Sequence, residues 1–158
     1  MLDRFKTQNE SVSVSERLRK MDEKQYFAVL ATDDEGHPYT SLVAYALTND
    51  LKKVIFATPK KTRKYRNIIN SGNVSLLIDN RMRDKKNLMQ AEAITIVGTA
   101  SVIRRGRLWN RFADIFLTKH PDFSEFIHSP STALIAIDIM QCVHVGKFQK
   151  VTAWNCNN

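Results

Sequence analysis

Short apolar segments separated by polar turns dominate the first half of the chain and predict strands. The Asp-Asp-Glu-Gly sequence at residues 33–36 is typical of a hairpin turn. Pro59 stops the third apolar segment, because proline donates no hydrogen bond to a sheet ladder. Consecutive strands joined by such short turns predict an antiparallel meander. The expected strands cover residues 26–32, 38–47, 53–58 and 73–79.

The second half of the chain adds three strands to this prediction. A long strand over residues 90–103 follows a polar loop over 80–87, and strands over 132–139 and 142–148 share a tight turn. Six or seven strands interrupted by helices predict a mainly β fold, a small closed antiparallel barrel with flanking helices. An open antiparallel α+β sheet has the same periodicity and is the alternative.

Helical periodicity appears at two places outside the strands of the first half. An N-terminal helix is expected over about residues 13–25, where Ser13 and Glu16 form a capping-box pattern. A shorter helix is expected over 62–71, with Gly72 placed to end it.

Composition narrows the class of protein without naming a function. The 158 residues are 43% hydrophobic and 25% charged, which suits one globular domain over residues 1–158. The longest apolar runs are strand-sized and the first residues lack an apolar signal core, so neither a membrane span nor a secretory signal is expected.

The two cysteines form neither a disulfide framework nor a metal motif. We expect Cys142 to be buried and inert and Cys156 to be exposed. The histidines have no ligand spacing, so no metal site is predicted, and a reduced, cytoplasmic protein is the simplest interpretation.

The formal net charge of +8 has three explanations: a solvated basic surface, a nucleic-acid partner or a small anionic ligand. Five of the seven residues from 60 to 66 are basic, at the point where a strand ends and a helix begins. Thr62 is a good N-cap, whereas Arg63 and Lys64 oppose the helix dipole. A bound anion would relieve that repulsion, so this helix start is either a phosphate site or a solvated basic turn. Aromatic residues are not interleaved with the basic clusters, which disfavours nucleic-acid binding.

Several motifs in order resemble one known family. Residues 56–64, Phe-Ala-Thr-Pro-Lys-Lys-Thr-Arg-Lys, are followed by Val-Ser-Leu-Leu at 74–77. Together with Gly-His-Pro at 36–38 and Gly-Thr-Ala at 98–100, they resemble the pyridoxamine 5′-phosphate oxidase-like proteins. The resemblance covers about residues 27–103. It implies a mainly β, FMN-binding split β-barrel that forms a homodimer, with FMN at the subunit interface.

The resemblance also implies roles for individual residues. Arg63 and Lys64 would hold the FMN phosphate, and Thr62 would add its hydroxyl or backbone N–H. Arg81, in a polar turn, is a further candidate for the cofactor and equally fits an exposed loop arginine.

Other residues of the resembling strands would lie along the rest of the cofactor. Ala57 and Thr58 would flank the ribityl chain or the flavin ring. Four consecutive residues of the second strand would run under the isoalloxazine and give it main-chain hydrogen bonds: Ser41, Leu42, Val43 and Ala44.

The chain departs from the oxidase itself at positions that handle substrate. Ser41 and Ala93 stand where the oxidase carries a basic residue and a glutamine, and no Arg-x-His follows near the C-terminus. Oxidation of pyridoxamine phosphate is therefore not expected, and no catalytic residue is identified. The helical insert at about 107–128 resembles relatives implicated in haem handling, although His120 is expected to be a capping or surface residue.

Three functional hypotheses follow. The first is an FMN-dependent oxidoreductase that passes electrons from a reduced nicotinamide to an unidentified acceptor. The second is a non-enzymatic carrier of flavin or haem, and the third a basic nucleic-acid-binding module. Deazaflavin F420 is an alternative to FMN as the cofactor.

Overall fold

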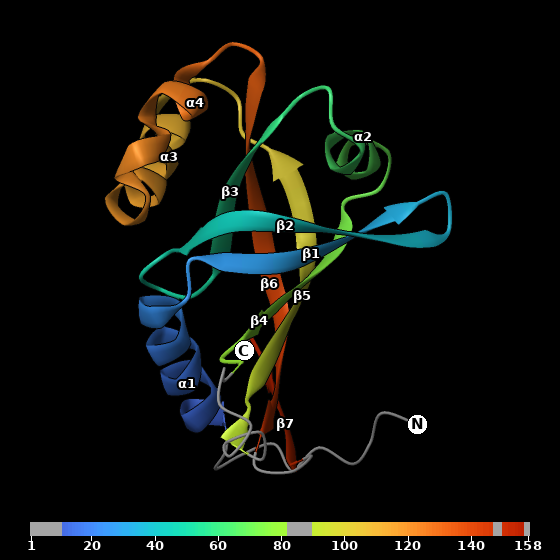
Figure 1. Ribbon diagram of the computed structural model, residues 1–158, viewed down its shortest axis with the longest axis vertical. Helices are drawn as coiled ribbons and strands as arrows, with labels where there is room; N and C mark the ends of the chain where they lie inside the picture. Colours follow the sequence, from blue (N-terminus) through green and yellow to red (C-terminus); the bar gives the residue numbers. More distant parts are fainter. Residues whose placement is uncertain (1–10, 82–89, 147–149, 157–158) are drawn as a thin grey trace.

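The computed structural model describes residues 11–81, 90–146 and 150–156 (Figure 1). Its helices are α1 (Ser11–Lys24), α2 (Arg63–Asn70), α3 (Arg107–Lys119) and α4 (Ser124–His128), with a 3-10 turn η2 (Pro121–Phe123) between the last two. Its strands are β1 (Phe27–Asp34), β2 (His37–Leu47), β3 (Lys53–Pro59), β4 (Asn73–Asp79), β5 (Ala93–Val102), β6 (Thr132–Gly146) and β7 (Lys150–Asn155).

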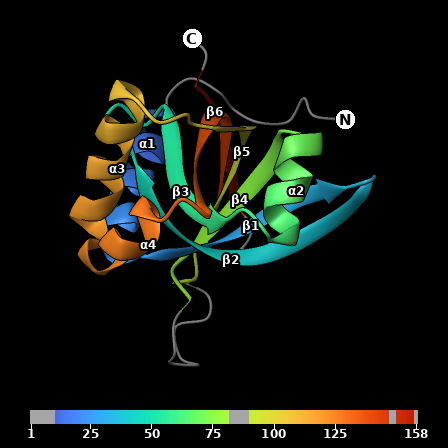
Figure 2. The same cartoon turned by 90° about the horizontal axis from the view of Figure 1, so that it is seen from above.

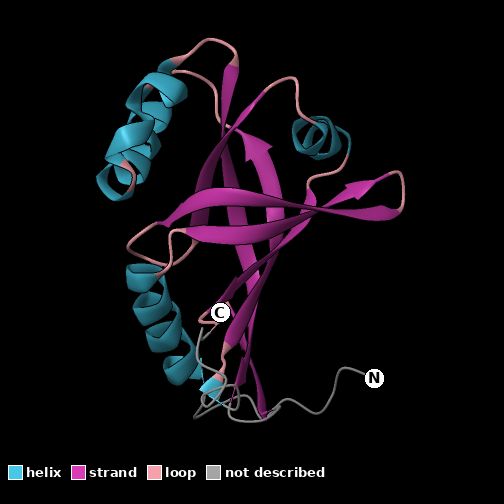
Figure 3. Cartoon of the chain, viewed as in Figure 1, coloured by secondary structure: helices cyan, strands magenta, loops and turns pink. Residues whose placement is uncertain are grey.

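These strands form one antiparallel sheet in the order β3-β2-β1-β4-β5-β6-β7. The sheet closes on itself because β3 also pairs with β6, from Lys53 opposite Asp138 to Pro59 opposite Thr132. Six strands therefore make a barrel, and β7 extends the sheet beyond β6 (Figure 3). The predicted closed barrel is confirmed and the open sheet is excluded.

The first hairpin forms at the predicted position. Glu35 and Gly36 take φ values of +53° and +88°, and Asp34 pairs with His37 across the turn. Two positive φ angles in a two-residue loop match the right-handed twist of the flanking strands, and glycine takes such a conformation without steric cost.

The last strands differ from the prediction. Residues 132–146 form one continuous strand, and the expected tight turn after residue 139 is absent. The register slips instead: Gln141 pairs with Val97 and Ile139 with Gly98, so Met140 is the extra residue of a β-bulge. The residues after 139, where the sequence pattern predicted a turn, form this bulge. The final described strand is β7, which the sequence pattern did not predict.

Two helix signals also have different roles from those predicted. Helix α1 begins at Ser11, so Ser13 lies inside the helix and not at its N-cap. Helix α2 ends at Ser71 in extended conformation, so Gly72 is not its terminator. A Cβ on Gly72 would lie 2.8 Å from the carbonyl oxygen of Ala100, and the Gly72 carbonyl accepts from Ala100 N–H at 2.7 Å. The glycine is needed for this close approach to β5.

The buried side chains form two clusters. One fills the barrel and includes Leu18 of α1 and Ile68 of α2. The other lies outside the barrel wall, where Phe112 and Phe116 of α3 pack against Ile55 of β3. Seen from above, α2 and the α3–α4 pair lie on opposite sides of the barrel (Figure 2). Among the helices of the described ranges, none has the length and apolar character that crossing a membrane requires.

Candidate functional site

The start of α2 is held in place by two threonine hydroxyls. Thr62 is the N-cap, as predicted, and its Oγ1 accepts from the backbone N–H of Tyr65 at 3.3 Å. The same hydroxyl lies 3.0 Å from Thr58 Oγ1 and 2.9 Å from the carbonyl oxygen of Pro59. Thr58 is buried at the end of β3. The strand end and helix start that the sequence assigned to the phosphate therefore form one rigid corner.

Arg63 already has an anion beside it. Its Nε donates to Asp34 Oδ2 at 2.7 Å, its Nη2 is ion-paired with the same oxygen, and its guanidinium lies 4.4 Å from the ring centroid of Tyr39. Two guanidinium nitrogens thus converge on one carboxylate oxygen, and a phosphate oxygen would be bound by the same nitrogens. Sequence reasoning missed both partners, since they lie on β1 and β2, far from Arg63 along the chain.

Lys64 differs from its neighbour. It is half-buried and makes no ion pair within the described residues, and burial lowers the pKa of its ammonium group. A partly desolvated cation gains more from an anion than an exposed one does. Lys64 is therefore the cation at this corner with the most to gain from a bound phosphate.

The edge of β2 beside this corner lacks a complete partner strand. On one side β2 pairs with β1 from His37 to Ala44, whereas on the other it pairs with β3 at Tyr45 to Leu47. In the described structure residues 38–44, called the β2 edge from here on, have no strand on that second side. Alternate N–H and C=O groups along it are available to a ligand.

The side chains of the β2 edge alternate between the two faces of the sheet. Val43 is buried in the barrel and Ser41 is half-buried, whereas Leu42 is 65% exposed. The Ser41 hydroxyl is buried without a hydrogen-bond partner in the described structure. On the outer face, Ala44 of β2 and Ala57 of β3 lie beside the cluster under α3. Residues 41–44 can therefore all contact one ligand only through their main chain, because their side chains alternate between the two faces of the sheet.

Arg81 is not part of this group within one chain. Its Nε donates to Asp79 Oδ2 at 2.8 Å, just beyond the end of β4. Six residue steps separate that end from the start of β4, a span of about 20 Å. Helix α2 lies near the opposite end of the barrel (Figure 1). Arg81 could meet the α2 corner only if it came from a second chain.

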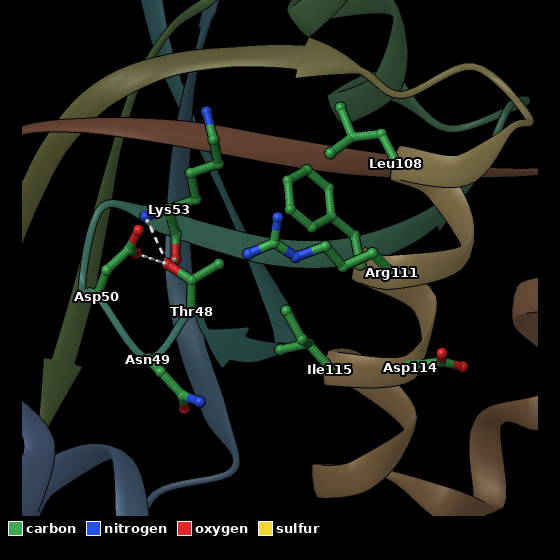
Figure 4. Close-up of a pocket in the computed structure, with 9 residues that line it drawn as sticks. Thr48, Asn49, Asp50, Lys53, Leu108, Arg111, Asp114 and Ile115 are labelled. Carbon is green, nitrogen blue, oxygen red and sulfur yellow. Dashed lines mark hydrogen bonds between the residues drawn. The ribbon is translucent and has the colours of Figure 1, made fainter.

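A cavity of about 730 Å³ lies elsewhere, between the β2–β3 turn and α3 (Figure 4). The Arg111 side chain extends from α3 toward Lys53 and Asp50. The Thr48 hydroxyl donates to Asp50 at 2.6 Å and holds the pKa of that carboxyl below its ordinary value. No sequence motif indicated this cavity, because a turn and a distant helix form it together.

A second cavity of about 440 Å³ shares Asn49 and Ile115 with the first. On its wall Lys119 donates to Asp22 Oδ1 at 2.6 Å and lies 4.0 Å from the ring centroid of Tyr45. Burial lowers the pKa of Lys119, and burial together with the nearby Asp22 carboxylate raises that of Tyr45. The ammonium is thus held by a carboxylate and an aromatic face.

His120 ends α3 as its C-cap, which confirms the capping role predicted for it. Its side chain is buried, however, and not on the surface. Nε2 lies 2.7 Å from the carbonyl oxygen of Tyr45, to which the neutral ring donates, and burial lowers the His120 pKa. Among the described residues no group of three or more His, Cys, Asp or Glu could hold a metal ion.

Comparisons with known proteins give a family and a fold. A family model described as pyridoxamine 5′-phosphate oxidase matches residues 14–146. A sequence comparison with curated proteins gives no match.

Solved structures of similar fold come from several bacteria. A haem-binding protein from Mycobacterium smegmatis has a TM-score of 0.79 at 17% identity, over 90% of this chain and 57% of that one. The haem storage protein HutZ from Vibrio cholerae has a TM-score of 0.64 at 17% identity, over 80% and 89%. An FAD-binding protein from Mesorhizobium loti has a TM-score of 0.65 at 16% identity, over 82% and 90%. This chain thus spans little more than half of the mycobacterial protein, and at these identities the likeness concerns the fold.

Proposed function

Because the chain belongs to the pyridoxamine 5′-phosphate oxidase family, we propose that it binds FMN between the β2 edge and the start of α2. The observation that carries this proposal is the open β2 edge lying beside a capped, basic helix start. Arg63 joins the two features, since it begins α2 and stacks on Tyr39 of β2.

The residues present fit FMN. Lys64 and the first N–H groups of α2 would bind the phosphate, and Arg63 would join them by exchanging Asp34 for it. The β2 edge would offer main-chain hydrogen bonds to the flavin, and the unpartnered Ser41 hydroxyl lies in the same segment. The small side chain of Ala57 would leave room for the ribityl chain beside Thr58. FMN, when bound, supplies the ability to accept a hydride or single electrons.

The site is completed, in this proposal, by a second copy of the chain. Leu42 on the β2 edge is 65% exposed and Ile69 on α2 is 57% exposed. Covering these two side chains in a dimer interface would remove their apolar surface from water. A homodimer with FMN at the interface would bury them, and Arg81 could then reach FMN from the partner.

The Thr58 and Thr62 hydroxyls lie 3.0 Å apart at the corner, and among the described residues neither is hydrogen-bonded to a side-chain base. We therefore propose first a protein that carries flavin or its electrons, because the flavin supplies the redox chemistry without an activated side chain at this corner. Oxidoreduction with a reduced nicotinamide as donor is the enzymatic version of the proposal. The partial neutralisation of Arg63 by Asp34 weakens the nucleic-acid hypothesis.

Haem is the second candidate cofactor, since two solved structures of similar fold are described as haem-binding or haem-storing. All four histidines lie in the described residues, and the rings of His120, His128 and His144 contact polar neighbours. His37, on the β1–β2 hairpin, and His128 are both exposed, and His128 uses only Nδ1 for the Ser124 carbonyl, so within the described residues these two rings offer a free nitrogen to iron.

Titration of the purified protein with FMN, riboflavin and haemin separates these candidates. We expect FMN to bind with a change in flavin absorption and fluorescence, and riboflavin to bind much more weakly because it lacks the phosphate. Tight haemin binding that is lost in His37→Ala or in His128→Ala, together with no FMN binding, would replace flavin by haem. F420 in place of FMN tests the deazaflavin alternative. Bleaching of bound FMN by NADH or NADPH without oxygen would show that the protein is an oxidoreductase that takes electrons from a reduced nicotinamide, and not a carrier.

A further inference from the structure

The β6–β7 hairpin brings the two cysteines of the chain together. Cys142 pairs with Trp154 across the two strands, and the backbone N–H of Cys156 donates to the Met140 carbonyl at 3.0 Å. Cys156 follows Trp154 by two residues, so it lies on the same face of the sheet and diagonal to Cys142. Both are free thiols.

The two thiols have different surroundings. Cys142 is fully buried in the barrel core, as predicted, whereas Cys156 packs on that core from its edge and is half-buried, not exposed as expected. A hydrogen bond between their side chains raises the pKa of Cys142 and lowers the pKa of Cys156. Cys156 is the more accessible of the two thiols and the one whose pKa is lowered, which favours thiolate formation there.

The place of Cys156 diagonal to Cys142, on the same face of the sheet, gives an oxidised Cys156 a neighbouring thiol as partner. Cys156 follows the last residue of β7 and lies in a turn, so its backbone is less constrained than a position within the strand. Met140, opposite it, is the bulged residue of β6, where the ladder is already irregular. Both positions can therefore shift more easily than residues inside a regular ladder, which the approach of the two sulfurs to bonding distance requires.

We propose that Cys156 and Cys142 reduce hydroperoxides, Cys156 as the attacking thiolate and Cys142 as the resolving thiol. The Cys156 sulfur attacks one peroxide oxygen, the O–O bond breaks, and the other oxygen leaves as an alcohol or water after protonation. Cys156 is then a sulfenic acid. The Cys142 sulfur attacks it, an S–S bond forms, and the released hydroxide takes the Cys142 proton and leaves as water. The two thiols lose two electrons, and the peroxide gains them.

Hydrogen peroxide and mass spectrometry test this proposal. The whole chain is treated with one equivalent of peroxide, the remaining thiols are blocked with iodoacetamide, and the mass is measured without reductant. We expect a monomer that has lost two hydrogen atoms and takes up no label, and that recovers both labels after reduction. Two labelled thiols after treatment, or a disulfide between two chains, would overturn the proposal.

Variants separate the two roles. Cys142→Ser should stop at a Cys156 sulfenic acid, which dimedone traps, and Cys156→Ser should leave Cys142 unreacted. Cys142→Ala removes the hydrogen-bond donor, so Cys156 should react with peroxide several-fold more slowly at neutral pH than in Cys142→Ser. Equal reactivity of Cys142 and Cys156 in the single variants would contradict the assignment. Because these readouts need no flavin, they do not depend on the proposed cofactor.

Discussion

Arg63 at the start of α2 is ion-paired with Asp34 at the end of β1. The basic helix start therefore contains an internal anion, and a phosphate bound there must compete with a carboxylate. Removing the charge of Asp34 should therefore strengthen phosphate binding and not weaken it.

Replacing Asp34 by asparagine should tighten FMN binding. Asparagine keeps an oxygen for Arg63 but removes the negative charge that repels a phosphate. The gain should not exceed about fivefold, because exposed ion pairs contribute at most about 1 kcal/mol. Fluorescence titration measures it, with Asp33→Asn in the same hairpin as the matched control. Weaker binding in Asp34→Asn would mean that Asp34 positions Arg63 for the phosphate.

Replacing Lys64 by glutamine should weaken FMN binding by about 10- to 100-fold, the usual effect of losing a charged hydrogen bond. Riboflavin affinity should not change, since riboflavin has no phosphate. The Arg63→Ala/Lys64→Ala double variant should lose FMN and keep the circular dichroism of the folded chain. Lys60→Gln, in the preceding turn, is the control. An equal loss of riboflavin and FMN would show that Lys64 does not contact the phosphate.

Replacing Leu42 by lysine should convert the proposed dimer into a monomer. The leucine is 65% exposed in one chain, so a lysine is tolerated there but leaves a charge in a dimer interface. Sedimentation velocity gives the mass, and FMN affinity should fall with it. Leu108→Lys, at a residue of α3 that is 49% exposed, is the control. A Leu42→Lys variant that still sediments as a dimer would place the interface elsewhere.

Acid should destabilise the fold partly through His120. Burial holds the His120 pKa below its ordinary value, so below about pH 6.5 the unfolded chain binds a proton that the folded chain does not. The free energy of unfolding should therefore fall as the pH decreases from that value toward the folded-state pKa, and change little above it. Urea unfolding at several pH values measures this slope.

His120→Gln keeps a side-chain donor for the Tyr45 carbonyl and removes the titration. Its pH dependence should be shallower than that of the parent chain. Some slope should remain, because burial also lowers the pKa of His144. Identical slopes in the two proteins would exclude His120 as a source of acid sensitivity.

Local patterns made the first half of the fold predictable. The apolar segment that became β4 and the Thr62 cap of α2 depend on neighbouring residues, and both lie where the sequence placed them. The bulge at Met140 was missed because a strand partner determines it. A Cβ on Gly98 would lie 2.2 Å from the Asp138 carbonyl oxygen, so β5 and β6 approach this closely only with glycine there.

In the candidate site, too, the sequence predicted the local features and missed those that depend on distant residues. The basic cluster around Arg63 was visible in the sequence, but Asp34 and Tyr39, which contact it, come from other strands. Exposure of Leu42 could not be predicted either, since an apolar residue in a strand is ordinarily taken to be buried. Most features of the site that the sequence did not predict depend on contacts between residues far apart along the chain.

The pairing of β3 with β6 also bears on how the chain reaches its fold. It joins residues 53–59 to residues 132–138, so the barrel cannot close until most of the chain has left the ribosome. Contacts of such long sequence separation slow folding, because the entropy of loop closure is lost before the contacts stabilise the product. Until β6 is available, one side of β3 is unpaired. During this time the nascent chain is most exposed to incorrect pairing with other strands.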